Sequence, residues 1–243
     1  MELLRHRRKL LYFITPSVGA RVAPEELPQI VESAIRGGAG LIQWRQKPSD
    51  AGLEAMSPLV QAQWKDRGKA PFLLDVARRI REVTRKFKVL LVVNDSVDLA
   101  LEIGADGVHV GQTDASLADV AGARGDALPW IVGVTVRDAP QAKAACEGGA
   151  TYLGVGPVFT SSTKPEANDG ATIDIDGLRA CSAVARQYDV PVYAIGGLSL
   201  KERRIQRCIQ EGDAAGVCAI AAISDATDRH AAAADIVAEL ARL

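Results

Sequence analysis

The chain has 243 residues, of which 48% are hydrophobic, and its formal net charge is -1 at pH 7. Its apolar content is sufficient for a large core, and no apolar stretch reaches the length of a transmembrane helix. The balanced charge, without long runs of one sign, argues against nucleic acid or an anionic membrane as the main partner.

The cysteines and the start of the chain indicate a cellular compartment. Four cysteines are scattered without C-x-x-C spacing, which predicts reduced thiols that pack inside a cytoplasmic protein. Basic residues precede the short apolar run LLYFIT, as in a secretory signal, but the run is too short and ends at Thr15-Pro16. We therefore expect it to be the first strand of a cytoplasmic protein.

Apolar strand-like segments alternate with segments of helical pattern along the whole chain. The predicted strands are Leu10–Thr15, Leu41–Lys47, Val89–Val93, Gly107–Gly111, Trp130–Val136, Tyr152–Phe159, Pro191–Ile195 and Gly216–Ile223. The predicted helices are Pro24–Arg36, an interrupted region from Asp50 to about Lys86, a helix capped by Ser96 that ends at Ile103, Asp114–Ala123, Pro140–Glu147, Ile175–Tyr188, a helix capped by Ser199 that ends at Gln210, and Asp225–Leu243.

This alternation predicts a parallel sheet with right-handed crossovers. Eight strand–helix units in a chain of this length match a (β/α)₈ TIM barrel. A doubly wound open sheet is the alternative, but it needs an early nucleotide-binding loop, and the sequence has neither G-x-G-x-x-G nor a Walker loop there. We therefore predict one α/β TIM-barrel domain over residues 1–243.

Two aspartates, Asp95 and Asp114, come just after neighbouring predicted strands. The carboxyl ends of parallel strands meet at one edge, where barrel enzymes carry their sites. A pair of carboxylates there, next to groups that suit a diphosphate, points to Mg²⁺. The alternative is that both aspartates are helix N-caps.

The second predicted strand carries Gln43, Arg45 and Lys47 at alternate positions, so that all three side chains share one face. Two cations and an amide near a strand end suit an anion. The alternative is that both cations point into solvent.

The loop after the sixth strand reads GPVFTSSTKP, with four hydroxyl residues before Lys164. Hydroxyls, backbone N–H groups and a lysine suit a diphosphate, and the length of the loop suits a lid. A flexible polar loop is the simpler interpretation.

Gly196-Gly197 after the seventh strand and Ile220-Ala221 near the end of the eighth complete the ring of loops. Loops after strands seven and eight of a barrel often bind phosphate. His109 lies within an apolar strand, and we expect it to be a core residue rather than a catalytic base. The residues alone thus predict a barrel enzyme with a Mg²⁺-dependent diphosphate pocket beside a second phosphate pocket, in which a phosphorylated acceptor displaces pyrophosphate.

Several motifs in one order resemble the thiamine phosphate synthase family. They are QWRQK, VVNDSVDLALEIGADGVHVGQTD, GVTVRD, YLGVGPVFTSSTKP, PVYAIGG and GVCAIAAI, and they span nearly the whole chain. The resemblance implies a transferase of thiamine biosynthesis. It joins hydroxymethylpyrimidine diphosphate to a thiazole phosphate and releases pyrophosphate through a dissociative, Mg²⁺-dependent substitution.

The resemblance also implies the roles of individual residues. Mg²⁺ is expected at Asp95 and Asp114, and the residues expected to bind the diphosphate are Arg45, Lys47, Asn94 and Lys164. Gln43 is expected near the pyrimidine ring, and Thr135 beside the pyrimidine or the diphosphate. The residues expected at the thiazole or its phosphate are Ser161, Thr163, Gly197, Ile220 and Ala221, the last three through backbone N–H groups.

The sequence departs from the family pattern at a few positions. Gln46 stands for a usual glutamate, although its alternation points it away from the pocket, and Ala221 stands for a usual serine. Thr135 and Ser161 exchange one hydroxyl for another. The segment around Gln63–Leu74 is longer than usual and has no assigned role.

Three alternatives stay open. A related thiazole tautomerase shares the fold, but that group lacks the intact aspartates and has histidine where Arg137 stands. A non-catalytic paralogue that binds thiamine-related phosphates would explain the departures. Another phosphate-binding barrel would give no reason for the paired aspartates. Small molecules are the expected partners, and a homo-oligomer is compatible with the sequence.

Overall fold

The computed structural model describes residues 4, 9–19, 22–47, 69–124, 130–160 and 171–243. Within them, parallel strands β1 to β8 close into a barrel in which each strand pairs with its sequence neighbour and β8 returns to β1. The strands are β1 (Leu10–Ile14), β2 (Leu41–Trp44), β3 (Leu90–Asn94), β4 (Gly107–Val110), β5 (Ile131–Val136), β6 (Tyr152–Val155), β7 (Val192–Ala194) and β8 (Gly216–Ala219). The predicted TIM barrel is therefore confirmed.

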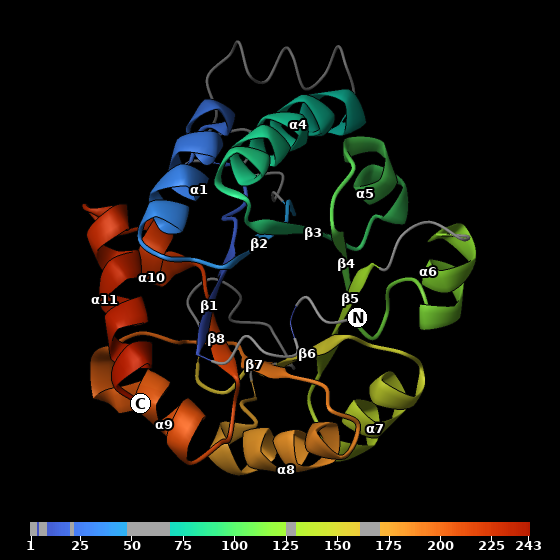
Figure 1. Cartoon of the computed structure of the whole chain (residues 1–243), viewed down its shortest axis with the longest axis vertical. Helices are drawn as coiled ribbons and strands as arrows, with labels where there is room; N and C mark the ends of the chain where they lie inside the picture. The colour runs from blue at the N-terminus through green and yellow to red at the C-terminus, as the bar shows by residue number, and fades with distance from the viewer. Residues whose placement is uncertain (1–3, 5–8, 20–21, 48–68, 125–129, 161–170) are drawn as a thin grey trace.

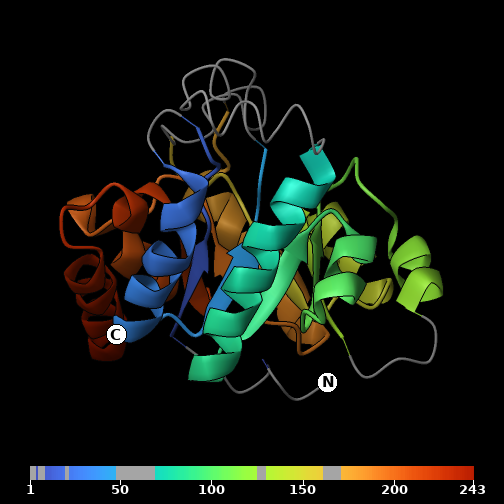
Figure 2. The same cartoon turned by 90° about the horizontal axis from the view of Figure 1, so that it is seen from above.

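Helices surround the barrel in chain order (Figure 1). They are η1 (Pro24–Glu26), α1 (Leu27–Arg36), α4 (Lys69–Phe87), α5 (Val97–Ile103), α6 (Leu117–Arg124), α7 (Ala139–Glu147), α8 (Asp174–Gln187), η3 (Lys201–Arg203), α9 (Arg204–Gln210), α10 (Ala221–Ser224) and α11 (Arg229–Arg242). Helices α1 and α4 lie side by side in Figures 1 and 2, and α1 also packs on α11.

The predicted cap of α5 is present, because the Ser96 hydroxyl accepts the N–H of Leu99, and Gly104 ends this helix in the left-handed conformation. Several predicted boundaries were wrong. The predicted eighth strand ran to Ile223, but β8 ends at Ala219 and α10 follows. Helix α6 starts at Leu117 rather than Asp114.

The third wrong boundary is at Ser199, which does not cap a long helix. A 3-10 turn, η3, follows it, and α9 starts only at Arg204. Glu202 and Arg203 between them have φ values of 53° and 54°, which a continuous helix does not allow. The predicted strands that ran to Lys47 and Phe159 also end earlier, at Trp44 and Val155.

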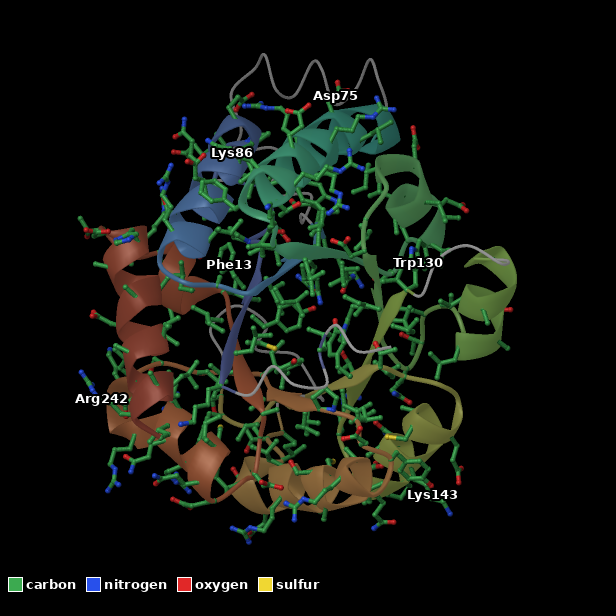
Figure 3. All side chains as sticks on the ribbon, viewed as in Figure 1. Phe13, Asp75, Lys86, Trp130, Lys143 and Arg242 are labelled. Carbon is green, nitrogen blue, oxygen red and sulfur yellow. The ribbon has the colours of Figure 1, made fainter. Side chains whose placement is uncertain are left out.

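Alternation along the strands produces two separate cores. One set of strand residues, which includes Leu11, Phe13 and Ile42, packs against the helices in the larger core cluster. Neighbouring residues such as Tyr12 and Leu41 point into the barrel and form a smaller cluster. In Figure 3 the charged side chains of Lys86, Lys143 and Arg242 lie on the outer faces of the helices. The helix–sheet layer therefore buries most of the apolar surface, and polar groups can be accommodated inside the barrel.

No helix among the described residues is long and apolar enough to span a bilayer. The four cysteines are all buried with free thiols, as the sequence predicts.

Asp106, on the turn before β4, connects α4 to β3 through hydrogen bonds. Its carboxylate accepts two hydrogen bonds from Arg81, at 2.8 and 3.2 Å, and one from the Leu91 N–H at 2.8 Å. We expect Asp106→Ala to lower the free energy of unfolding by about 2–3 kcal/mol, because it leaves a mostly buried guanidinium and a strand N–H without their acceptor. Urea unfolding measures the change.

A second ion pair on α4 supplies the control. Arg78 and Glu102 form an exposed ion pair at 3.0 Å, with half of each side chain in solvent. Glu102→Ala should change stability by less than about 1 kcal/mol. Equal losses in both variants would contradict the role given to Asp106.

Candidate active site

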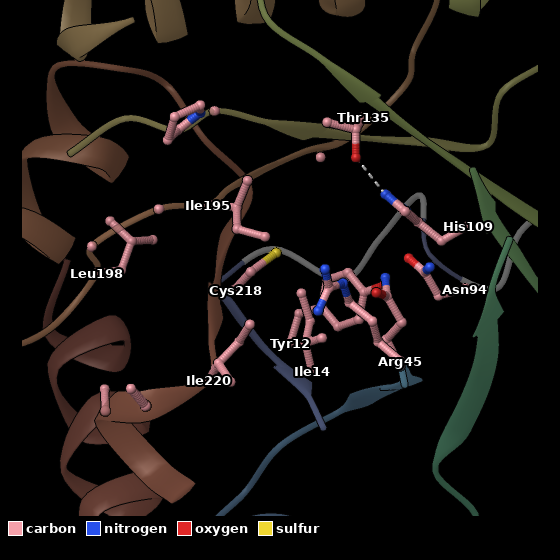
Figure 4. A pocket seen from close by; sticks show the side chains of 18 of the residues that line it. Tyr12, Ile14, Arg45, Asn94, His109, Thr135, Ile195, Leu198, Cys218 and Ile220 are labelled. Atoms are coloured by element: carbon pink, nitrogen blue, oxygen red, sulfur yellow. Dashed lines mark hydrogen bonds between the residues drawn. The ribbon is translucent and has the colours of Figure 1, made fainter. Parts of the chain in front are cut away.

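A cavity of about 1080 Å³ opens at the carboxyl ends of the strands. Every strand contributes to its lining, either directly or through the residue that follows it: Ile14, Gln43, Asn94, His109, Thr135, Gly154, Ile195 and Cys218. In Figure 4 the polar side chains of Arg45, Asn94 and His109 lie on one side, and the apolar side chains of Ile195, Leu198 and Ile220 lie on the other. The cavity thus has a polar half and an apolar half.

The structure brings most of the predicted site residues together in this cavity. The ones that line it are Gln43, Arg45, Lys47, Asn94, Asp95, Asp114, Thr135, Gly197, Ile220 and Ala221. The other three, Ser161, Thr163 and Lys164, lie outside the described residues, as do the proposed lid and residues 63–68 of the segment Gln63–Leu74.

The two aspartates are held by backbone contacts at adjacent strand ends. The Asp95 N–H donates to the His109 carbonyl at 2.8 Å, and the Asp114 carboxylate accepts the N–H of Gly111 at 2.8 Å. Neither aspartate is the N-cap of a helix, since Ser96 caps α5 and α6 begins at Leu117. The capping alternative is therefore wrong for both.

The charges of the aspartates are strongly coupled. Burial raises the pKa of Asp95, helped by Asp114 and opposed by Lys47, whose Nζ lies 2.5 Å from Asp95 Oδ2. Burial opposes ionisation of Asp114 as well, but hydrogen bonds from Asp95 and from the Gly111 N–H lower its pKa overall. The pair therefore holds two carboxyl groups that repel when both are ionised, and nearby positive charge relieves this repulsion.

Among the described residues, no group of three or more His, Cys, Asp or Glu side chains could hold a metal ion. Two carboxylates are nevertheless the usual protein contribution to a Mg²⁺ site, where water and substrate phosphates supply the other oxygens. The donor chemistry of Asp95 and Asp114 fits that type of site.

The two cations extend past the end of β2. The Thr15 hydroxyl fixes this extension, because it accepts the Arg45 N–H at 3.0 Å and donates to the Arg45 carbonyl at 3.1 Å. Gln46 turns the other way: its side chain accepts the Val18 N–H and donates to the Pro16 carbonyl, both at 2.8 Å. Its predicted orientation away from the pocket is confirmed.

The loop after β7 is shaped by Gly196 and Gly197, whose φ values are 100° and 62°. The guanidinium of Arg204 donates to the Gly197 carbonyl at 2.8 Å and stacks on the ring of Phe159, 5.0 Å from its centroid. The position of Arg204 was not predictable from the sequence, because it depends on the turn that delays the start of α9. On the other side of the pocket, Ala221 opens α10, where the first helical N–H groups have no partner within the helix.

His109 is a hydrogen-bonded core residue, as predicted, with 6% of its surface exposed. Its ring nitrogens lie 2.8 Å from the Tyr152 hydroxyl and 2.7 Å from the Thr135 hydroxyl. Burial lowers the pKa of His109 to about 4, so the ring is neutral at pH 7. The contact of Tyr152 with His109 was not predictable from the sequence, because a tyrosine within an apolar strand resembles an ordinary core residue.

A family model described as thiamine monophosphate synthase matches residues 11–224. The chain is 35% identical to a thiamine-phosphate synthase of Archaeoglobus fulgidus over 232 residues, covering 96% of this chain and 93% of the relative. It is 38% identical over 215 residues to the thiamine biosynthesis bifunctional protein ThiM/ThiE of Symbiobacterium thermophilum, covering 88% of this chain but only 39% of that longer protein.

A solved structure, the thiamine phosphate pyrophosphorylase of Pyrococcus furiosus, superposes with a TM-score of 0.70. It is 30% identical, and the match covers 98% of each chain. A 3-hexulose-6-phosphate synthase with 19% identity and a TM-score of 0.62 shares the fold alone.

The low pKa of His109 predicts that acid destabilises the protein. The unfolded chain binds a proton at this histidine near pH 6.5, whereas the folded chain binds it only near pH 4. As the pH falls between these values, the free energy of unfolding should decrease by up to about 1.4 kcal/mol per pH unit from this group. Urea unfolding of wild type and His109→Gln from pH 7 to pH 4 gives the slope of the free energy of unfolding against pH for each protein. The slope should be smaller in the variant.

His230, an exposed histidine on α11, provides the control. His230→Gln should keep the wild-type slope. If His109→Gln also keeps it, His109 is not responsible for the acid sensitivity.

Proposed function

The chain belongs to the thiamine monophosphate synthase family, and we propose that the cavity at its strand ends is the active site of that synthesis. The enzyme condenses hydroxymethylpyrimidine diphosphate with a thiazole phosphate to give thiamine phosphate and pyrophosphate. The observation that carries the assignment of the site is that Asp95 and Asp114 line the same cavity as Arg45, Lys47 and Asn94. Small molecules are therefore its substrates.

The polar half of the cavity is proposed to bind the pyrimidine diphosphate. Arg45 and Lys47 reach this half from the end of β2, and Asn94 reaches it from the end of β3. Cations and an amide donor suit the oxygens of a diphosphate. Lys164 is proposed for the same role by resemblance, and Gln43, deeper in the barrel, for the pyrimidine ring.

We propose that Asp95 and Asp114 hold Mg²⁺. When bound, the ion would neutralise part of the charge on the diphosphate. Arg45 and Lys47 are placed to stabilise the further negative charge that develops as the bond between carbon and diphosphate oxygen breaks. The bonding electrons leave with pyrophosphate, and the thiazole nitrogen then supplies the electron pair of the new carbon–nitrogen bond.

A dissociative path of this kind passes through a pyrimidine cation, which is sensitive to positive charge nearby. His109 lines the pocket, and the low pKa of its ring keeps it neutral. A protonated histidine at that position would oppose the cation at close range. The buried, neutral state of His109 is thus compatible with the proposed chemistry.

The other half of the cavity is proposed to bind the thiazole phosphate. Backbone N–H groups of Gly197, Ile220 and Ala221 are the proposed phosphate donors, since backbone donors at the loops after strands seven and eight recur in barrel phosphate sites. A backbone donor is unaffected by alanine in place of serine at position 221. Ser161 and Thr163 are proposed partners of the same substrate.

The buried free thiols also support a reducing compartment, and we propose the cytoplasm.

The first test is synthesis itself. Purified protein with both phosphorylated substrates and Mg²⁺ should form thiamine phosphate and pyrophosphate in equal amounts, measured by mass spectrometry and a pyrophosphate assay. EDTA should abolish the product, and added Mg²⁺ should restore it. Tight binding of thiamine phosphate without turnover would instead support a non-catalytic paralogue.

The second test addresses the metal site without relying on turnover. Asp95 has a φ of 64°, a left-handed conformation that asparagine tolerates better than alanine, so Asp95→Asn should keep the fold. Mg²⁺ with pyrophosphate should raise the melting temperature of wild type and have little effect on this variant, while kcat falls about 100-fold or more.

Asp98→Asn is the matched control, because Asp98 is an exposed aspartate of α5 only three residues away. It should respond to Mg²⁺ and pyrophosphate like wild type. An undiminished thermal response in Asp95→Asn would remove Asp95 from the proposed metal site.

A further inference from the structure

Five polar side chains from five strands form one continuous chain of hydrogen bonds along the floor of the pocket. Gln43 Nε2 donates to the Tyr12 hydroxyl at 2.5 Å, and the Tyr12 and Tyr152 hydroxyls are 2.7 Å apart. The Tyr152 hydroxyl lies 2.8 Å from His109 Nδ1, and His109 Nε2 lies 2.7 Å from the Thr135 hydroxyl. The last contact is drawn in Figure 4. Tyr12, Gln43, His109 and Thr135 all line the pocket, and Gln43 and Thr135 are the two ends of the chain of hydrogen bonds.

A glycine in β5 leaves space for this chain of hydrogen bonds inside the barrel. His109, Gly133 and Tyr152 are paired neighbours across β4, β5 and β6, so the side chains of His109 and Tyr152 meet over the glycine. A Cβ atom at Gly133 would lie 2.1 Å from the Tyr152 ring and 2.5 Å from His109 Nδ1. The contact between the histidine and the tyrosine therefore requires a residue without a side chain between them.

The amide of Gln43 gives the first hydrogen bond a direction. Its nitrogen donates to Tyr12, so the Tyr12 proton is available for Tyr152. If the remaining contacts run in the same direction, Tyr152 donates to His109 Nδ1 and the neutral ring carries its proton on Nε2. Nε2 then donates to the Thr135 hydroxyl, whose own proton can be donated to a substrate in the pocket.

We propose that Tyr12, Tyr152 and His109 are positioning residues that select the pyrimidine substrate through Gln43 and Thr135. With the amide nitrogen engaged by Tyr12, Gln43 presents its carbonyl oxygen, an acceptor, to the pocket. At the other end, Thr135 presents a donor. The chain thus fixes the polarity of two groups that contact the substrate. This inference rests on the proposed function.

The fixed polarity favours an aminopyrimidine over its oxo analogue. The exocyclic amino group donates a hydrogen bond, which the Gln43 oxygen accepts. An oxo group at the same ring position presents an acceptor instead, so two lone pairs face each other and the buried amide oxygen loses its partner. A site built around such a hydrogen bond rejects the mismatched analogue strongly.

The kinetic test compares kcat/KM for the amino substrate with kcat/KM for the 4-oxo analogue of the pyrimidine diphosphate. Tyr152→Phe removes the hydroxyl that accepts the Tyr12 proton. Tyr12 can then donate to the Gln43 oxygen, and the side-chain amide can rotate so that its nitrogen faces the pocket. The wild-type preference for the amino substrate should fall about tenfold or more. His109→Gln, which can keep a donor near Thr135, should retain more of the preference than His109→Leu.

Tyr193→Phe is the matched control. Tyr193 is fully buried and its ring contacts those of Tyr12 and Tyr152, with centroids 5.9 and 5.5 Å away, but its hydroxyl takes no part in the four hydrogen bonds above. If the tyrosines had only a structural role, Tyr152→Phe and Tyr193→Phe would change the preference for the amino substrate to the same extent. An unchanged preference in Tyr152→Phe, or an equal loss in Tyr193→Phe, would overturn the proposal.

The second test does not depend on turnover. In protein labelled with ¹⁵N-histidine, the ring nitrogens of His109 are identified by their absence from the spectrum of His109→Gln. The proposal expects a proton on Nε2 and none on Nδ1 at pH 7.5, and a mixture of the two forms in Tyr152→Phe. A proton on Nδ1 in wild type would reverse the chain and overturn the proposal, even if the synthesis is demonstrated.

Discussion

Closure of the parallel barrel is the constraint on which everything else depends. Each strand pairs with its sequence neighbour in one direction, so every carboxyl end lies at the same rim. Residues as far apart in sequence as Arg45 and Ala221 therefore line one cavity. The hydrogen-bonded ladder positions their backbone before any side chain interacts, and a loop can change without moving the strand end that it follows.

The two cores have different roles: the larger one stabilises the fold, and the smaller one inside the barrel shapes the pocket. The larger core, between strands and helices, is built from aliphatic side chains such as Leu11 and Ile42. It buries enough apolar surface for the barrel interior to hold Tyr12, Tyr152 and His109. These interior polar groups are tolerated because their hydroxyl and ring nitrogen atoms are hydrogen-bonded to one another. The alternation of each strand therefore separates residues that stabilise the fold from residues that shape the pocket.

Local patterns in the sequence were sufficient for the barrel and for the positions of Asp95 and Asp114, because both follow from strand order. The errors occurred where tertiary contacts override pattern. Apolar residues after Ala219 look like more strand, yet the chain turns into α10. The chain of hydrogen bonds was beyond prediction for another reason: Tyr12 and Tyr152 are 140 positions apart, and their meeting depends on barrel register rather than on any local motif.

The ion pair between Lys47 and Asp95 compensates two opposite charges in the polar half of the cavity. The lysine and the carboxylate lie 2.5 Å apart, and Asp114 accepts a hydrogen bond from the Gly111 backbone. In the proposed function, a diphosphate and a divalent cation would offer each group a new partner, the phosphate oxygens for Lys47 and the cation for Asp95. Both charges would then stay compensated through the exchange of partners. Because 48% of the Lys47 side chain and 25% of the Asp95 side chain are exposed, solvent would also screen the two charges during this exchange.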